Sequence, residues 1–271
     1  MKFLFTFFTF GIFLWISANT ENGSTGSMAA AMAGTSITNI DVFASSNNPA
    51  ATAFLTQHAL GFYFQNKYLI PELNGTHACF VFQNNKIGSF SSSLSHSGYK
   101  VFNETISSLA YARKFGSSVS TGLKLSYHQL KIQENGSKAL FALQLSLLYK
   151  IRDQLVLGLV VNNPIKQKLN APAKESLPTT IAIGIGYHPS EKLRLAMQLQ
   201  KDLKYPIQAS LGVEYQIHKI LSTRLGAGIN PLLLSGGIAF QLQAFDIAIS
   251  SSWDQYLGFS PQLSLQYAFG K

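Results

Sequence analysis

The sequence predicts an all-β fold, a transmembrane antiparallel β-barrel of about fourteen strands. Apolar residues alternate with small or polar ones along most of the chain after residue 57, and successive side chains of a strand point to opposite faces. Turn lengths between these stretches alternate as well. Charged residues make up only 12% of the 271 residues, against about 25% in soluble domains. A sheet with one apolar face that meets lipid accounts for all three observations.

Residues 1–18 have the pattern of a secretory signal peptide. Lys2 provides a positive start, residues 3–15 an apolar core, and Ser17-Ala18 a small-residue cleavage site. A transmembrane anchor is the alternative, but the apolar run is shorter than the roughly 20 residues that a spanning helix needs. We therefore expect an exported protein whose signal peptide is cleaved.

Residues 19–56 differ from the rest of the chain because they do not alternate. Residues 26–34 are small and helix-permissive, and residues 41–55 are rich in Ala, Ser and Asn. The segment is too small for a domain and too apolar for a disordered tail. We expect short helices and turns here, ahead of a barrel over residues 57–271.

The alternation predicts strands near the 9–11 residues that a tilted strand needs to cross a bilayer. It is clearest over 181–188, 193–200 and 207–216, where the repeats at three and four residues expected of a helix are missing. An even strand number is the rule for bacterial single-chain barrels. The predicted strands are 57–66, 76–84, 86–95, 105–115, 117–129, 138–149, 154–163, 178–188, 192–201, 206–216, 221–229, 233–242, 244–252 and 261–269.

The connections also indicate a membrane barrel. Short periplasmic turns that alternate with longer outer loops are typical of outer-membrane barrels, and an open sheet edge in hydrocarbon leaves costly unpaired backbone groups. A secreted β-sandwich or lipocalin-like barrel is the alternative; the high strand number and a polar face rich in Gly, Ala and Ser argue against it. Tight turns are expected at 84–86, 115–117, 150–153 and 188–192, and longer links at 66–75, 95–104, 130–137 and 163–177.

The charged and reactive residues exclude several function classes. The net charge is +9, but the basic residues are scattered, whereas nucleic-acid binding needs a clustered basic footprint; attraction to anionic lipid head groups or plain solvation explains the excess better. Cys79 is the only cysteine, so no intrachain disulfide forms. The six histidines lack metal-ligand spacing, and no nucleophile elbow or phosphate loop is present. We expect no metal, no cofactor and no enzymatic activity.

Two N-terminal stretches resemble the start of the FadL-type outer-membrane transport proteins. They are residues 26–34 (GSMAAAMAG) and 46–51 (SNNPAA), which correspond to a small-residue stretch and an Asn-Pro-Ala-Gly-Leu-like element. Here Ala51 and Thr52 replace the usual Gly-Leu. Residues 108–116, 186–196 and 201–206 look like the PorV/PorQ branch of the same superfamily, found in Bacteroidetes.

This resemblance implies a fourteen-stranded barrel of the bacterial outer membrane, with residues 19–56 folded into the lumen as a hatch. The function it implies is binding and passage of hydrophobic small molecules through the hatch-gated lumen. The alternative is a non-transporting accessory of type IX secretion that binds protein cargo or the translocon. Outer-membrane lipids and the outer-membrane assembly machinery are further expected partners. The residues expected to anchor the hatch are Asn47, Asn48, Pro49 and Ala50.

Two further groups of residues are candidates for function. Five charged side chains fall on the polar face and are expected to line the lumen, either as interior ion pairs or as a constriction that selects what passes. The first outer loop offers an apolar stretch, which is either a landing site for ligand or a bare loop patch. The luminal group is Lys124, Arg194, Glu214, Arg224 and Asp246; the loop group is Tyr68, Leu69 and Ile70.

Overall fold

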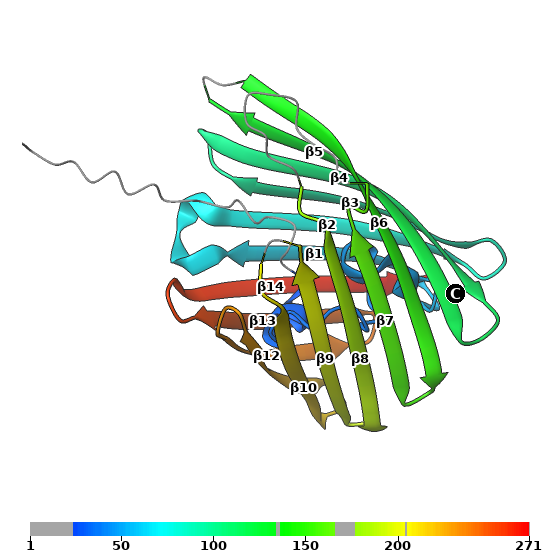
Figure 1. The fold of residues 1–271 in the computed structure, drawn as a ribbon. Coiled ribbons are helices and arrows are strands. Elements are labelled where there is room, and N and C mark those ends of the chain that lie inside the picture. The colour runs from blue at the N-terminus through cyan, green and yellow to red at the C-terminus, as the bar shows by residue number, and fades with distance from the viewer. Residues whose placement is uncertain (1–23, 134–135, 166–176, 204, 271) are drawn as a thin grey trace, which may run out of the picture.

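The computed structural model describes residues 24–133, 136–165, 177–203 and 205–270, and within them the chain forms one closed antiparallel barrel of fourteen strands (Figure 1). The predicted fold class is confirmed, whereas the predicted signal peptide lies outside the described residues. The strands are β1 (His58–Asn66), β2 (Asn74–Asn84), β3 (Gly88–Gly98), β4 (Phe102–Phe115), β5 (Val119–Ile132), β6 (Gly136–Arg152), β7 (Leu155–Asn162), β8 (Thr180–Ser190), β9 (Leu193–Asp202), β10 (Gln208–His218), β11 (Leu221–Ile229), β12 (Leu233–Leu242), β13 (Phe245–Asp254) and β14 (Gly258–Phe269).

Each strand pairs with its neighbours in the chain, and β1 pairs with β14 to close the sheet. This closing pair runs in register from His58 opposite Phe269 to Gln65 opposite Gln262. Closure satisfies the backbone groups that a free edge would leave unpaired in lipid.

Two of the predicted long links are mostly strand. The sequence predicts links at 95–104 and 130–137, but β3 extends to Gly98, β4 begins at Phe102, and β5 continues to Ile132. These prediction errors share a cause: the outward side chains of the extensions, such as Asn103 and Lys131, are polar, so the outward apolar face fades while the pairing continues. Strands β4–β6 therefore rise beyond the rest of the wall (Figure 1).

The outward face of the wall is apolar and the inward face is small or polar. On β8, Ile181, Ile183 and Ile185 are exposed, whereas Ala182 between them is 4% exposed. Outward aromatic side chains recur near strand ends, as with Phe90 and Tyr111, whose ring centroids lie 4.9 Å apart. Such a band with aromatic borders matches the surface that a bilayer solvates. No helix within the described ranges combines the length and the hydrophobicity needed to cross a membrane.

Residues 24–57, called the N-terminal segment below, form three short helices: α1 (Ser27–Ala31), α2 (Ala44–Asn47) and α3 (Pro49–Thr52). Small residues build these helices, and Pro49 occupies the first position of α3, where its missing N–H costs nothing. Helix α1 contacts β11–β14, and α3 contacts β4–β6 on another part of the wall. The segment is therefore enclosed by the barrel, as the blue ribbon in Figure 1 shows. Two further 3-10 turns, η1 (Lys67–Leu69) and η2 (Pro71–Leu73), follow β1 outside the sheet.

Candidate functional site

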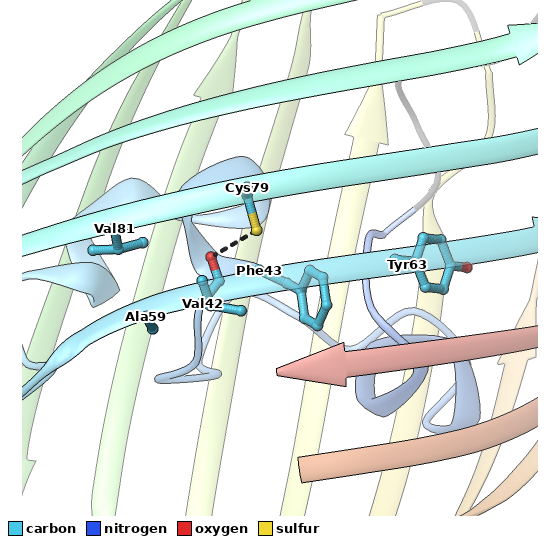
Figure 2. Close-up of a cluster of buried hydrophobic side chains, with 6 residues drawn as sticks. All are labelled: Val42, Phe43, Ala59, Tyr63, Cys79 and Val81. Atoms are coloured by element: carbon cyan, nitrogen blue, oxygen red, sulfur yellow. Dashed lines mark hydrogen bonds between the residues drawn. The ribbon is translucent and has the colours of Figure 1, made fainter. Parts of the chain in front are cut away.

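The second half of the N-terminal segment packs on the wall through a buried apolar cluster (Figure 2). Val42 and Phe43 of the segment meet Tyr63 of β1 and Cys79 of β2, with Ala59 and Val81 completing the cluster. The rings of Phe43 and Tyr63 lie edge to face with centroids 6.2 Å apart. Phe43 is fully buried, so it is the main apolar anchor of this half.

The Asn-Pro-Ala element lies against β5 and β6. The Asn48 side-chain amide donates to the carbonyl of Ile37 at 2.6 Å, which ties two parts of the segment together. Ala50 is held by two wall serines: its N–H donates to Ser146 Oγ at 3.0 Å, and its carbonyl accepts from Ser120 Oγ at 2.7 Å. This element is therefore hydrogen-bonded to the wall through both backbone groups of Ala50.

Asn47 acts within the segment itself. Its side-chain oxygen accepts from the Thr25 N–H at 2.9 Å, and its side-chain amide donates to the Thr25 carbonyl at 2.8 Å. The start of the segment is thus joined to α2 through one side chain. The structure brings Asn47, Asn48, Pro49 and Ala50 together as neighbours, and their role in a hatch stays a prediction.

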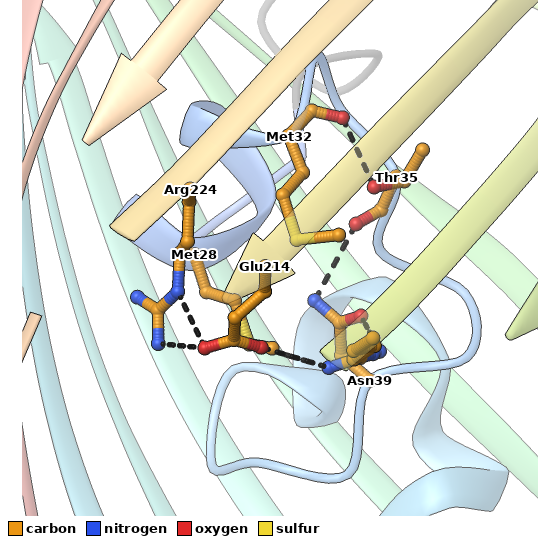
Figure 3. A network of polar contacts seen from close by, with 7 residues as sticks. Met28, Met32, Thr35, Asn39, Glu214 and Arg224 are labelled. Carbon is orange, nitrogen blue, oxygen red and sulfur yellow. Dashed lines mark hydrogen bonds and ion pairs between the residues drawn. The ribbon is translucent and has the colours of Figure 1, made fainter. Parts of the chain in front are cut away.

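The first half of the N-terminal segment meets a charged network on β9–β11 (Figure 3). Glu214 accepts from Arg224 Nε at 2.8 Å, and its other carboxylate oxygen lies 4.0 Å from Arg194 Nη1. Arg194 also donates to the side-chain oxygen of Asn39 in the segment, and its Nη1 lies 3.6 Å from the sulfur of Met28. Arg194 therefore joins the segment to the wall, while Glu214 on β10 lies between the arginines of β9 and β11.

The two remaining luminal candidates lie apart from this network or at its border. Lys124 of β5 donates to the Ser46 carbonyl at 3.0 Å, on the α2 side of the lumen. Asp246 of β13 is near Arg224 and Glu214, and its Oδ1 is buried without a hydrogen-bond partner among the described residues. The five charged residues thus form contacts around the segment, and their role in selecting what passes stays a prediction.

Asp41 is a segment residue that sequence reasoning passed over. Burial raises the pKa of its carboxyl to about 6, although the hydrogen bond from the Ala44 N–H and the positive charge of Arg194 act in the opposite direction. The group consequently changes its charge at mildly acidic pH.

Glycines of the wall allow the segment to approach the strands closely. A Cβ at Gly122 would lie 2.5 Å from the Ala50 nitrogen, and one at Gly226 would overlap the backbone of Met32 and Ala33. Neither overlap can be relieved by moving a flexible side chain. These inward glycines therefore set the distance between segment and wall.

The contacts of the segment that the sequence did not predict come from ordinary polar side chains. Gln198 Oε1 accepts from the N–H groups of Ser36 and Ile37 at 2.9 and 3.2 Å. Ser235 accepts from the Ala33 N–H and donates to the Ala31 carbonyl, both at 2.8 Å. Inward serines and glutamines are frequent in the sequence, so only the strand register could have singled these out.

The predicted landing loop lies at the end of the barrel away from the short turns. Tyr68 adopts a left-handed conformation with φ 59°, and its N–H donates to Ser260 Oγ of β14 at 3.0 Å. Leu69 and Ile70 are exposed, at 62% and 42%. The structure therefore places an apolar surface at the rim, and its use by a ligand stays a prediction.

The chain resembles solved structures of FadL-type channels in fold. A TodX variant described as a monoaromatic hydrocarbon channel superposes with a TM-score of 0.71 at 14% identity, over 90% of this chain and 99% of that one; TodX is a toluene transporter of Pseudomonas putida. The CymD monoaromatic hydrocarbon channel gives 0.69 at 13% identity, over 93% and 99%. A FadL homologue of Pseudomonas aeruginosa gives 0.69 at 11%, over 91% and 98%.

No protein-family model and no curated protein matches the sequence. At the identities above, the similarity establishes the fold and leaves the ligand open. The predicted FadL-type architecture is confirmed at this level, whereas the predicted likeness to the PorV/PorQ branch gains no support from these structures.

Proposed function

We propose that this protein is an outer-membrane barrel that passes hydrophobic small molecules, with the N-terminal segment as its hatch. The observation that carries the proposal is the enclosed segment, which contacts β4–β6 with one helix and β11–β14 with another. The apolar outer surface supports a place in the membrane. The fold shared with monoaromatic hydrocarbon channels supports the class of ligand.

The route of passage runs through the lumen. Pairing is continuous around all fourteen strands of the described barrel, and the irregularities in register are confined to the short-turn end, at Lys150/Arg152, Tyr187/Ser190 and Gln216/His218. A side exit would require breaking ladder hydrogen bonds in lipid, where each unsatisfied group costs several kcal/mol. Movement of the segment needs no such break.

The attachment of the segment suits a movable part. Its contacts with the wall are side-chain hydrogen bonds and apolar packing, such as the bond between Thr52 Oγ1 and Ser89 Oγ at 2.5 Å. Each such bond contributes a net stabilisation of only about 0.5–1.5 kcal/mol. The inward wall is rich in Ser, Gln and Gly, so the apolar surface that a hydrophobic ligand would contact lies on the segment, at Met32, Ile37 and Phe43, which are buried until the segment moves.

A reversible crosslink tests the hatch. Thr52→Cys with Ser89→Cys joins the segment to β3, and Ser108→Cys with Ser126→Cys joins β4 to β5 within the wall, where the two hydroxyls lie 3.0 Å apart. Both pairs are placed in a Cys79→Ala background. Uptake of a labelled monoaromatic hydrocarbon by cells producing each variant is compared with and without reductant.

The first pair should lose uptake when oxidised and regain it on reduction, while the wall pair keeps the uptake of the parent in both states. Undiminished uptake through the oxidised first pair would contradict the hatch. A parent barrel that takes up no more hydrocarbon than a vector control would contradict hydrophobic passage itself. The type IX accessory role stays a prediction from resemblance, and recovery of a translocon or cargo from native membranes would revive it.

A further inference from the structure

A polar cavity of about 170 Å³ lies at the short-turn end of the barrel. The β2–β3 turn, the end of β4 and Ala53, the residue that follows α3, surround it. Its volume has room for several water-sized groups, since one water needs roughly 10–15 Å³. The cavity is lined by Ala53, Gln83, Asn84, Asn85, Lys86, Gly88, Arg113 and Lys114.

The charged groups of the lining all have the same sign. Lys86 lies in the turn, and Arg113 and Lys114 are the two residues before Phe115, which ends β4; all three side chains are exposed. The lining contains no carboxylate. Three cations around one small cavity repel one another, and an anion placed between them removes that repulsion and accepts charge-assisted hydrogen bonds.

A buried amide supplies a second, independent indication of a ligand. Gln83 is 8% exposed, its side-chain amide donates to the Ala53 carbonyl at 3.3 Å, and its Oε1 has no hydrogen-bond partner among the described residues. A buried acceptor left unsatisfied costs about 1–3 kcal/mol. A ligand that carries a hydroxyl as well as a negative charge would satisfy it.

We propose that this cavity binds a phosphate-type oxyanion, with Lys86, Arg113 and Lys114 as the cationic partners and Gln83 Oε1 as acceptor of a ligand hydroxyl. The planar fork of Arg113 suits two phosphate oxygens at once. The anion also contacts Ala53, so its binding stabilises the end of the N-terminal segment against the wall. This inference does not depend on what the barrel transports.

The phosphate has two possible sources, a phospholipid head group or a free anion. Arg113 follows Ala112, which is buried and inward, so its side chain leaves β4 on the lipid side, where the aromatic pair of Phe90 and Tyr111 borders the apolar band. A head group of the periplasmic leaflet could therefore reach the cavity from the membrane. A free phosphate would reach it from the periplasm.

Binding to the purified, detergent-solubilised protein tests the proposal. The probes are inorganic phosphate, with sodium chloride at equal ionic strength as reference, and short-chain phosphatidylglycerol, with the matching diacylglycerol as reference. The readouts are the unfolding midpoint and the lipid retained in native mass spectrometry. The test variant is K86Q/R113Q/K114Q, and the matched control is R152Q/K192Q/K219Q, which removes the same charge from other short turns.

A probe containing phosphate should raise the midpoint of the parent and of the control, and bind the test variant at least tenfold more weakly. An effect of inorganic phosphate identifies a free anion as sufficient, and an effect of phosphatidylglycerol alone identifies a lipid head group. Equal binding by both triple variants, or no effect of either phosphate probe on the parent, overturns the proposal. If the test variant does not fold, R113K replaces it, because it keeps the charge but loses the fork and should bind several-fold more weakly.

Discussion

The two halves of the N-terminal segment are held to the barrel by different physical means. Residues 42–54 are held mainly by apolar packing, with hydrogen bonds from serine, lysine and glutamine side chains of the wall, whereas residues 26–39 contact the ion-paired network of Arg194, Glu214 and Arg224. Apolar packing carries no charge on which pH can act, whereas ion pairs are weakened by salt and by protonation of a partner. The attachment of the first half should therefore depend on pH and ionic strength more than that of the second half.

Phe43→Ala should break the apolar half most severely. Truncating a fully buried phenylalanine typically costs about 3–5 kcal/mol because the cavity fills only in part. Urea unfolding of the refolded barrel in detergent measures the loss. Phe54→Ala is the matched control, since Phe54 is only partly buried under the Lys150 ammonium, which lies 4.2 Å from its ring centroid. Equal losses in both variants would contradict the anchor role of Phe43.

Glu214→Gln tests the charged half. The change leaves Arg224 and Arg194 without their carboxylate, and removing one partner of a buried pair costs about 3–5 kcal/mol; we expect the lower end because the Glu214 side chain keeps some exposure to the lumen. Protease sensitivity of residues 26–39 should rise while that of residues 42–54 stays unchanged. Glu191→Gln, in an exposed turn, should leave both unaffected. Cleavage that increases equally in both halves would show that the halves are not independent.

Gly226→Ala asks how closely the first half is fitted to the wall. The added methyl group overlaps the backbone of Met32 and Ala33, so we expect a loss of about 1–3 kcal/mol in urea unfolding. Gly228→Ala lies two residues further along the same strand and meets nothing closer than 3.3 Å. It should cost clearly less. A pair of variants with the same midpoint would mean that the segment does not lie in contact with β11.

The smallest expected effect is the pH dependence of stability that comes from Asp41, which lies between the two halves. Because burial raises the pKa of Asp41 to about 6, the folded state favours the protonated carboxyl. Stability contributed by Asp41 should therefore rise as pH falls from 7 through 6 and level off below the unfolded value near 3.8. Subtracting the unfolding free energies of Asp41→Asn from those of the parent isolates this group. A difference that stays flat from pH 7.5 to 5 would contradict the raised pKa.

The wall of the barrel could be predicted from the sequence, but the contacts of the segment could not. Alternating apolar and small residues identify a strand because successive side chains of an extended backbone point to opposite faces of the sheet. The run from Ile181 to Ile185 is an example. The pattern fails at the extensions of β4 and β5, where the outward side chains are polar and the outward apolar face therefore ends.

The candidate site needed distances between residues far apart in the chain. The bond from Ala50 to Ser146 joins residues separated by 96 positions, and that from Ala33 to Ser235 joins residues separated by 202. Nothing in an inward serine distinguishes one with such a partner from its neighbours. The Asn-Pro-Ala element can be singled out in the sequence only because its residue types resemble a family motif. The inward face of the wall contains many glycines, and the sequence does not distinguish those that lie against the segment from the others.

The pairing of β1 with β14 has a consequence for biogenesis. β1 begins at His58, directly after the segment, and pairs with β14, which follows all the other strands in the chain, so the sheet cannot close into a cylinder before β14 has been made. Because the segment directly precedes β1, formation of the seam fixes the point at which the segment enters the lumen. The seam therefore joins closure of the wall to placement of the segment inside it.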